Sequence, residues 1–341
     1  MTCRARVPDR FRANAGPLLW SKLRCPCCLR RRVDAGELSW DGATARCSGC
    51  GREYPVFEGI PVLLDEGSEP ETVERHSGDV ANAREFYETV FKAEDYSERE
   101  LEVHEARIRA ILGKYLPASP AVLEVGSGRG QLQHLFDRYL ALDISLTALS
   151  SFIDGPAVCA RAEALPVADA SFDFIVTIAT LEHVLAPDLA FAELERVLAP
   201  GGVLYLAPAW HVRAWAAEGL PVRPYTDLSW QQRIRKALLP LLDNIAFRGA
   251  IRIPWRLSRR LYWRLVKRGP VSLRWKRLRP NYEKYWMSDS DAACSLDSHE
   301  GILYFESRGW QCLSHEAVVA RLFARGDAVV IRKPMYVEGC Q

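Results

Sequence analysis

Residues 121–130 constrain the fold of this chain more than any other stretch. Residues 121–125 form a short apolar run that is rich in β-branched side chains, which predicts one buried strand of a parallel sheet. Three glycines follow at once, Gly126, Gly128 and Gly130, and residues 131–136 read as the first turns of a helix. A strand, a glycine turn and a helix allow backbone N–H groups to approach a ligand closely. The stretch therefore predicts a ligand site at the carboxyl end of this strand.

A second short strand supports this interpretation. Residues 139–143 are apolar up to Asp143, which follows Gly126 by 17 residues. A carboxylate at that point can accept two hydrogen bonds from ribose hydroxyls. The glycine loop would also fit a dinucleotide-binding dehydrogenase, but its G-x-G-x-G spacing lacks the extra residue of the dinucleotide fingerprint.

Four further motifs decide between these classes. They are Glu-Ala-Leu-Pro at 163–166, Ser-Phe-Asp-Phe-Ile-Val at 171–176, Leu-Glu-His-Val at 181–184 and Arg-Val-Leu-Ala-Pro-Gly-Gly at 196–202. An apolar strand at 203–206 follows the last of them. In this order the motifs resemble the class I S-adenosylmethionine-dependent methyltransferases, in particular the methyltransferase type 11 group, over residues 101–210.

The resemblance implies an α/β fold with a doubly wound, seven-stranded, mostly parallel sheet of the Rossmann-like methyltransferase type. Expected strands lie at 121–125, 139–143, 156–159, 173–178 and 203–207, and expected helices start near 129, 146 and 188. Later in the chain, Asp297 is expected to cap a helix that runs to Ser307. Two antiparallel strands, at 310–314 and 328–331, then close the sheet.

The same resemblance implies the residues that bind the cofactor, S-adenosylmethionine. The three glycines leave room for its methionine part, and Asp143 holds the ribose. Glu124 either contacts the amino group or orders the loop. Ala162 and Glu163 line the adenine, although the neighbouring position that usually carries an acid is Arg161. Three residues before the first strand, Arg84, Phe86 and Tyr87, either reach the cofactor or simply pack on the sheet.

Methyl transfer needs few catalytic groups because the sulfonium is already an activated donor. Thr180, Glu182 and His183 follow the fourth strand and face the methyl group in related folds. His183 is a candidate general base for a hydroxyl acceptor. The alternative is that His183 and Glu182 only shape the loop or cap the next helix.

A cysteine pattern defines a separate unit at residues 21–65. Two C-x-x-C turns give Cys25, Cys28, Cys47 and Cys50, with 18 residues between the turns. Thiolates two residues apart can occupy two tetrahedral positions on one Zn²⁺, so two such turns close a structural site. The rival interpretation is a disulfide pair, but ten cysteines without a visible secretion signal indicate a reducing compartment. The unit resembles the zinc ribbons that accompany some methyltransferases.

Between the expected fifth strand and the closing elements lies a basic insert, residues 211–286. It holds 18 Lys and Arg against four Asp and Glu, an excess of 14. With Trp210 it also carries seven of the ten tryptophans. On a helical wheel that starts at Pro254, residues 255–268 separate an apolar side from a basic side. The apolar side is Trp255, Leu261, Tyr262, Leu265 and Val266, and the basic side is Arg256, Arg260, Arg264 and Lys267.

Three functions of the insert stay open. A basic, aromatic, amphipathic helix is typical of a segment that lies in a membrane interface or meets a lipid-linked substrate. The same pattern can bind RNA through phosphate contacts and base stacking, which is the less favoured partner. The apolar side can also pack on the protein itself while the arginines stay solvated.

The predicted organisation is therefore a basic leader at 1–20, the ribbon at 21–65, a linker at 66–80, a methyltransferase domain at 81–210 and 287–335, and the insert at 211–286. No early apolar run resembles a signal peptide and no stretch could span a bilayer, so we expect a cytoplasmic protein, peripheral at most on the inner membrane face. The oligomeric state is open.

The expected function is methyl transfer to an O or N acceptor, a small molecule, glycan or lipid-linked saccharide. Residues 285–292 resemble methyltransferases of bacterial polysaccharide and glycoconjugate gene sets, which makes Asp289, Asp291 and His299 candidates for binding sugar hydroxyls. An RNA methyltransferase and a non-catalytic scaffold that binds the cofactor poorly because of Arg161 are the alternatives.

Overall fold

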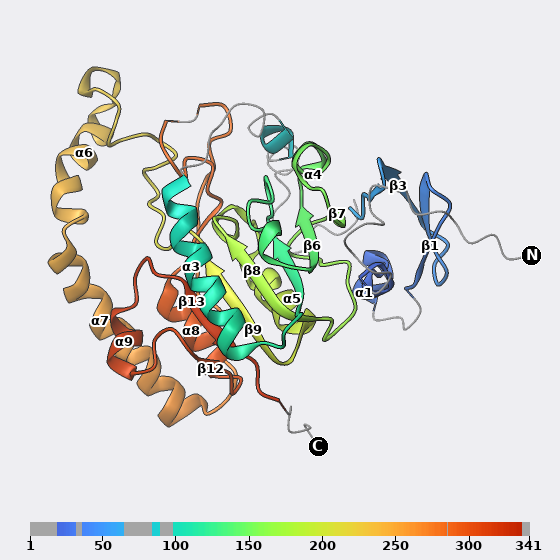
Figure 1. The fold of residues 1–341 in the computed structure, drawn as a ribbon. Helices are drawn as coiled ribbons and strands as arrows, with labels where there is room; N and C mark the ends of the chain where they lie inside the picture. The colour runs from blue at the N-terminus through green and yellow to red at the C-terminus, as the bar shows by residue number, and fades with distance from the viewer. Residues whose placement is uncertain (1–18, 32–35, 65–83, 89–97, 285, 336–341) are drawn as a thin grey trace, which may run out of the picture. The chain divides into compact units, whose positions relative to one another are not determined.

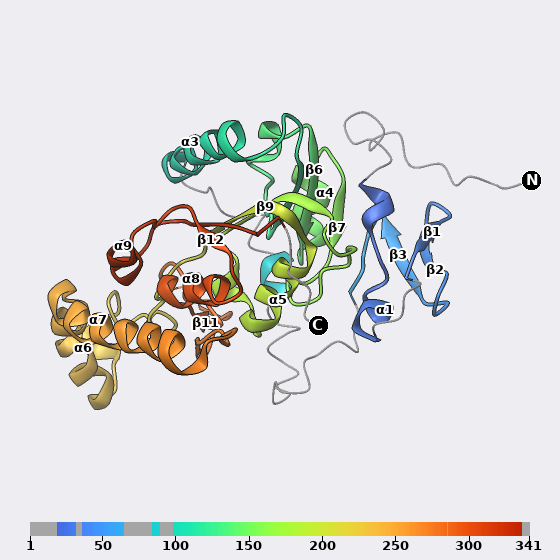
Figure 2. The ribbon, with the colours of Figure 1, turned by 90° about the horizontal axis from the view of Figure 1, so that it is seen from below.

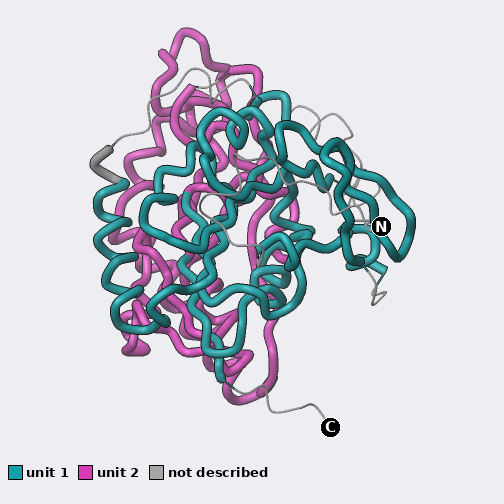
Figure 3. Tube along the Cα trace, turned by 45° about the vertical axis from the view of Figure 1, so that its right-hand side comes forward, with its two compact units in different colours: residues 1–178, 189–205, 333–341 teal, residues 179–188, 206–332 magenta. Residues whose placement is uncertain are grey.

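The computed structural model describes residues 19–31, 36–64, 84–88, 98–284 and 286–335 (Figure 1). The predicted linker, and nearly all of the predicted leader, lie outside these residues. The chain divides into two compact units. Figure 3 colours unit 1, which comprises residues 1–178, 189–205 and 333–341, and unit 2, which comprises residues 179–188 and 206–332. This division cuts across the predicted domain boundaries, which stay a prediction.

Unit 1 begins with the cysteine-rich module. A turn of 3-10 helix, η2 (Trp20–Lys22), and the short helix α1 (Pro26–Arg31) precede four strands, β1 (Leu38–Trp40), β2 (Thr44–Cys47), β3 (Glu53–Phe57) and β4 (Ile60–Pro61). The strands pair consecutively and antiparallel, with Trp40 opposite Ala45 and Ala45 opposite Tyr54. Ala45 and Tyr54 are buried, so the small sheet has a core of its own.

The module is joined to the large sheet of unit 1 by backbone hydrogen bonds. Arg24 N donates to Pro166 O at 2.9 Å, and Leu63 N donates to Cys159 O at 2.8 Å. Val62 also forms a parallel bridge with Cys159. The segment that follows β4 therefore pairs with the outer side of β7 (Ala157–Cys159), the last strand of the large sheet.

The expected parallel strands are present in unit 1. They are β5 (Ala121–Val125), β6 (Arg138–Asp143), β7, β8 (Phe172–Ile178) and β9 (Leu198–Ala207). β5 pairs in parallel with β6 on one side and β8 on the other, and all five of its residues are buried. Continuous apolar strands are expected when both faces of a sheet are covered. Figure 2 shows α3 (Glu98–Tyr115) and α5 (Pro187–Val197) on opposite faces of the strands.

The helix expected near residue 129 is not formed, which corrects the prediction. Residues 131–136 hold only one 3-10 turn, η3 (Gln133–Leu135). The side chain of Gln133 contacts the end of the next helix and the loop after it. Its Nε2 donates to Phe152 O, and its Oε1 accepts from Asp154 N. β6 begins at Arg138, so too few residues remain for a stable α-helix. The helix expected near 146 is α4 (Leu146–Phe152), and the one near 188 is α5.

Unit 2 contains the closing hairpin of the sheet. β12 (Gln311–Cys312) pairs antiparallel with β13 (Val329–Arg332), with Cys312 opposite Ile331. The large sheet has the strand order β12-β13-β9-β8-β5-β6-β7, the expected seven strands. α8 (Ser298–Glu306) is capped by Asp297, whose side chain accepts from His299 N, as predicted. Shorter elements are β10 (Lys276–Arg277), β11 (Cys294–Ser295) and α9 (Val318–Phe323).

The basic insert folds within unit 2 as two helices, α6 (Trp230–Leu242) and α7 (Ile245–Tyr262), followed by a π-helical turn, η6 (Trp263–Lys267). The start predicted at Pro254 is wrong, because α7 begins after Asn244, whose side chain accepts from Ala246 N and Phe247 N. A side-chain cap of this kind satisfies the free N–H groups of the first turn. Pro254 lies inside the helix instead.

The arginine side of α7 points inward, the reverse of a solvated basic stripe. Arg256, Arg259 and Arg260 are buried, and they pair with Asp297, Glu300 and Glu306 at N–O distances of 2.8, 2.9 and 2.8 Å. The predicted apolar side is exposed: Trp255 at 54%, Leu265 and Val266 at 66% each, and Leu261 and Tyr262 at nearly half. The idea that this apolar side packs on the protein is therefore wrong. Buried arginines require paired carboxylates, and α8 supplies them.

Candidate active site

The glycine loop of unit 1 has the backbone conformation that its sequence requires. Gly126, Gly128 and Gly130 have φ values of 73°, 49° and 63°, a region that other residues rarely adopt. Gly126 N and Ser127 N both donate to Leu142 O, at 2.8 and 3.0 Å. The loop is thereby fixed between the carboxyl ends of β5 and β6.

Asp143 binds the loop from the end of β6. Its Oδ2 accepts from Gly128 N at 2.8 Å, and its Oδ1 accepts from Ser145 N at 2.9 Å. Burial raises the pKa of this carboxyl, and the backbone donors oppose the rise because they stabilise the charged form. A carboxylate has about four lone-pair positions, so both oxygens keep capacity for further donors.

Glu124 lies on β5 beside this carboxylate. The Tyr139 hydroxyl donates to its Oε2. Burial raises the pKa of Glu124 to about 8, and the nearby Asp143 adds to the rise, so the acid is mostly protonated at neutral pH. These contacts join Glu124 to β6, and its two predicted roles stay predictions.

Glu88 is a residue of this region that sequence reasoning missed. Residues 84–88 are helical, and the Glu88 carboxylate accepts from Leu146 N at 2.8 Å and Thr147 N at 2.9 Å. With the Ser145 side chain, which accepts from Ala148 N, it completes the N-terminal cap of α4. Glu88 follows the three predicted cofactor contacts Arg84, Phe86 and Tyr87 in the same helical segment, and only this proximity could have indicated it.

The expected adenine segment follows β7. Ala162 is buried, while Arg161 and Glu163 are half-buried. Ala164 N donates to Arg161 O at 3.2 Å and closes a turn there. Unit 1 thus brings together the three glycines, Glu124 and Asp143, with Ala162 and Glu163 on the loop after the neighbouring strand.

The three predicted catalytic residues lie in unit 2, on and before the 3-10 turn η4 (Leu181–His183). Glu182 is fully buried, and its Oε1 accepts from Ala209 N at 2.8 Å. His183 Nδ1 lies 3.1 Å from Asp291 Oδ2. One carboxylate oxygen each of Glu182 and Asp289 and one ring nitrogen of His183 lie within 4.8 Å of one another. Thr180 is the N-cap residue of the turn, without a side-chain cap bond.

His183 is protonated at neutral pH in this environment. Burial lowers its pKa, but Asp291, Glu182 and Asp289 outweigh burial and raise the pKa to about 9. An imidazolium cannot accept a proton, so His183 acts as a base only where the pH is high or where a bound acceptor displaces its carboxylate partners. The arrangement offers a donor and several acceptors for polar groups. Of the predicted sugar-binding residues, Asp289 and Asp291 belong to this cluster.

His299 does not belong to it, which corrects the prediction. Its side chain is completely buried, and Arg260 Nε donates to its Nε2 at 3.0 Å. Burial and the neighbouring arginines lower its pKa to about 3, so it stays neutral. His299 is part of the interior of unit 2 and has no access to a sugar.

The four predicted metal ligands converge in the cysteine-rich module. Their Sγ atoms all lie within 4.8 Å of one another, with Cys25–Cys50 at 3.7 Å and Cys28–Cys47 at 3.6 Å. A tetrahedron with Zn–S bonds of about 2.3 Å has edges of about 3.8 Å. Disulfide sulfurs lie at about 2.05 Å, so neither pair is a disulfide. The donor set and geometry fit Zn²⁺, and Cys27 is buried outside the cluster.

Together these features define an α/β protein with a ligand loop at the carboxyl ends of two parallel strands. Residues 123–206 match a family described as a methyltransferase domain. This part of the chain is therefore similar to a methyltransferase domain.

The chain is similar to several known proteins, over part of its length or at low sequence identity. A malonyl-[acyl-carrier protein] O-methyltransferase of Marinomonas sp. (strain MWYL1) is 37% identical over 102 residues, which cover 26% of this chain and 38% of that protein. Among solved structures, the 1,6-didemethyltoxoflavin-N1-methyltransferase of Burkholderia thailandensis is 13% identical, with a TM-score of 0.41 over 84% of this chain and 97% of its own. A methyltransferase of Thermotoga maritima is 18% identical, with a TM-score of 0.37 over 74% and 100%.

Proposed function

We propose that this protein transfers a methyl group from S-adenosylmethionine to an O or N acceptor on a glycan or lipid-linked saccharide. The observation that carries the proposal is the glycine loop bound by the Asp143 carboxylate, inside the segment that matches the methyltransferase family. The residues fit the cofactor: three loop positions with positive φ are glycines and carry no side chain, and Asp143 retains acceptor capacity for ribose hydroxyls. When bound, the cofactor supplies the activated methyl group.

The acceptor is inferred from the polar cluster of unit 2. His183 donates, and Asp289 and Asp291 accept, which suits sugar hydroxyls or amines. The Marinomonas relative is an O-methyltransferase, which supports an oxygen acceptor. In this proposal His183 and Glu182 orient the acceptor, and Thr180 borders them.

A lipid-linked acceptor is supported by the outward apolar side of α7. Trp255, Leu261 and Leu265 are about half exposed or more, as are Trp230 and Ile234 on α6. Such a surface favours peripheral contact with a membrane interface. Within the described residues, no helix is both long and apolar enough to cross a bilayer. RNA is the weaker alternative, because Arg256, Arg259 and Arg260 of the basic insert are buried against carboxylates.

The cysteine cluster holds one structural Zn²⁺ in this proposal. Cys25, Cys28, Cys47 and Cys50 supply four thiolates, so the site is closed and leaves no position for a substrate. The metal stabilises the module and takes no part in methyl transfer.

Calorimetric titration with S-adenosylmethionine tests the proposed function. We expect the wild-type protein to bind the cofactor and Asp143→Ala to lose most of the affinity, because the variant removes both the ribose acceptor and the anchor of Gly128. Asp143→Asn keeps an acceptor for Gly128 N and should retain the fold with weaker binding. Asp154→Ala, in the loop after α4, is the matched control and should bind normally.

A folded wild-type protein that does not bind S-adenosylmethionine would contradict the proposal and favour the scaffold alternative. Binding without methylation of any lipid-linked saccharide or glycan would keep the cofactor site and reject the acceptor class.

A further inference from the structure

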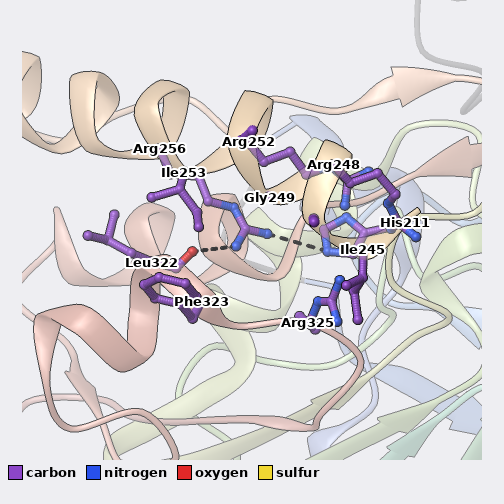
Figure 4. A pocket seen from close by; sticks show the side chains of 12 residues that line it. His211, Ile245, Arg248, Gly249, Arg252, Ile253, Arg256, Leu322, Phe323 and Arg325 are labelled. Carbon is purple, nitrogen blue, oxygen red and sulfur yellow. Dashed lines mark hydrogen bonds between the residues drawn. The ribbon is translucent and has the colours of Figure 1, made fainter. Parts of the chain in front are cut away.

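Unit 2 contains a cavity of about 360 Å³ beside the first half of α7 (Figure 4). Its cationic lining comprises Arg248, Arg252 and Arg256 from consecutive turns of α7, with Arg325 from the loop after α9. The apolar lining includes Ile245, Ile253 and Phe323. Among the described residues that line it, none is acidic. The methyl-transfer proposal uses none of these residues.

Arg256 is the fixed member of the cluster. Its Nη1 donates to Leu322 O at 2.6 Å and Ala324 O at 2.9 Å, and its Nη2 pairs with Asp297 at 2.8 Å. His211, on the same cavity wall, lies with Nε2 3.4 Å from Nη2 of Arg256. Burial and the surrounding arginines lower the pKa of His211 to about 3, so it is neutral and adds no charge.

The other three arginines of the cavity differ from Arg256 in their charge pairing. Within the described part of the chain, Arg248, Arg252 and Arg325 form no ion pair, and the Nε atom of Arg248 is buried without a hydrogen-bond partner. A buried donor without a partner costs free energy, and so do like charges held together. Asp243 and Asp297 are the acids that act on this cluster, and Asp297 is already bound by Arg256.

The pKa values of the arginines reflect this repulsion. The pKa of Arg252 is lowered to about 10, by burial first and then by Arg248 and Arg213, against the opposing effect of Asp297. Burial also lowers the pKa of Arg248, with Arg325 contributing in the same direction. A bound anion would remove this repulsion, since it supplies the missing negative charge.

We propose that this cavity binds a phosphate group, as a monoester or diester, through Arg248, Arg252 and Arg325. Guanidinium groups bind phosphate oxygens through paired N–H donors, and three of them suit a ligand with up to two charges better than a single carboxylate. The volume exceeds that of a phosphate alone, and the apolar walls accept the carbon groups attached to it. The site stands independently of the proposed methyl transfer.

The test is calorimetric titration with inorganic phosphate and with a short-chain phosphatidic acid, using the diacylglycerol of the same chain length, which lacks the phosphate group, as the neutral control. Arg252→Gln should weaken phosphate binding about tenfold or more, the loss of one charge-assisted hydrogen bond. Arg264→Gln, an exposed arginine of η6 outside the cavity, should bind as the wild type does.

Thermal unfolding provides a second readout, in which the substitution and the added phosphate affect the melting temperature differently. Without phosphate, Arg252→Gln should melt at a higher temperature than the wild type because it removes a repelled cation. Added phosphate should raise the melting temperature of the wild type and leave that of Arg252→Gln nearly unchanged. This result also shows that the variant is folded.

The two titrants identify the source of the phosphate group. Equal affinities indicate a site for free phosphate or a small phosphate ester, and much tighter binding of phosphatidic acid indicates a lipid headgroup. If neither binds, or if Arg252→Gln and Arg248→Gln bind as tightly as the wild type, the proposal is wrong.

Discussion

At the scale of single residues, Gly130 illustrates how a motif position serves packing as well as ligand access. An added Cβ would lie 2.2 Å from Ile153 Cδ1, and φ is 63°. Gly130→Ala should therefore lower the free energy of unfolding by about 2–4 kcal/mol, from overpacking and backbone strain together. Urea unfolding measures this change.

Gly113 is the matched control for this substitution. It lies in α3 with no atom within 4 Å of an added Cβ. Gly113→Ala should raise stability by about 0.5–1 kcal/mol, because alanine loses less entropy in a helix. Equal effects of the two variants would contradict this account of Gly130.

His183 gives a pH prediction. Its folded-state pKa of about 9 lies above the usual 6.5, so folding favours the protonated form. This stabilisation is complete below about pH 6.5 and is lost as the pH rises through about 9; its size is on the order of 3 kcal/mol at most. Denaturant unfolding at both pH values, compared with His183→Gln, measures it, and the variant should lack most of the difference.

The same residue separates orientation from base catalysis. If His183 is the base, turnover should rise with pH through about 9, and Asp291→Asn should move that rise to lower pH. Near-normal turnover of His183→Ala with bound cofactor would leave only the orienting role.

The positions of the predicted cofactor residues could be read from the sequence because they follow short, strongly apolar strands, while their binding of the cofactor stays a prediction. Asp143 and the glycines lie where a parallel sheet must place them. The protonated state of His183 was not predictable, since it depends on Asp289 and Asp291, more than 100 residues away in the chain. His299 was misassigned because nothing in the sequence shows that Arg260 covers it.

At the scale of elements, the cysteine module makes a prediction about metal. Purified protein should contain one zinc per chain, and Cys47→Ser should lose the metal and the cooperative melting of β1–β4. Cys27→Ser, which changes a buried cysteine outside the cluster, should keep the zinc. Elemental analysis measures the content, and a metal-free protein with an intact module would contradict the structural role.

The exposed side of α7 makes a prediction about membranes. Leu261→Glu with Leu265→Glu should lower the partition coefficient onto anionic vesicles by about a hundredfold or more, since two buried apolar side chains contribute about 3–6 kcal/mol to interfacial binding. Val319→Glu, an equally exposed position on α9, is the control. Binding that disappears completely in high salt would instead favour RNA or another polyanion.

Helix periodicity predicted the two sides of α7 but left open which side faces the protein. An apolar side normally faces the core. Here the arginine side faces inward because Asp297, Glu300 and Glu306 pair with three arginines, and the sequence alone does not show this pairing. Pro254 suggested a start because proline favours the first turn, yet Asn244 supplies the cap. The short helix expected near 129 failed for lack of room before β6.

At the scale of the whole molecule, the seven-stranded, mostly parallel sheet was predictable because its strands are short apolar runs and parallel strands allow few topologies. The closing hairpin, with Cys312 opposite Ile331, also agrees with the expected antiparallel pair. The division into two units was not predictable: residues 179–188, next to β8 in sequence, belong with residues 206–332. Their contacts are the reason, since Ala293 N donates to Glu182 O at 2.8 Å.

The pairing of Val62 and Leu63 with β7 also bears on the self-association of this protein. A strand at the end of a sheet offers free N–H and C=O groups to any other chain, and proteins commonly cover such edges. Here the cover is a segment that follows directly on β4 of the cysteine module. Chelation or oxidation of the four cysteines would uncover β7 and invite edge-to-edge aggregation, which light scattering would detect before any change in the parallel strands. We therefore expect self-association of this protein to increase when the four thiols are oxidised.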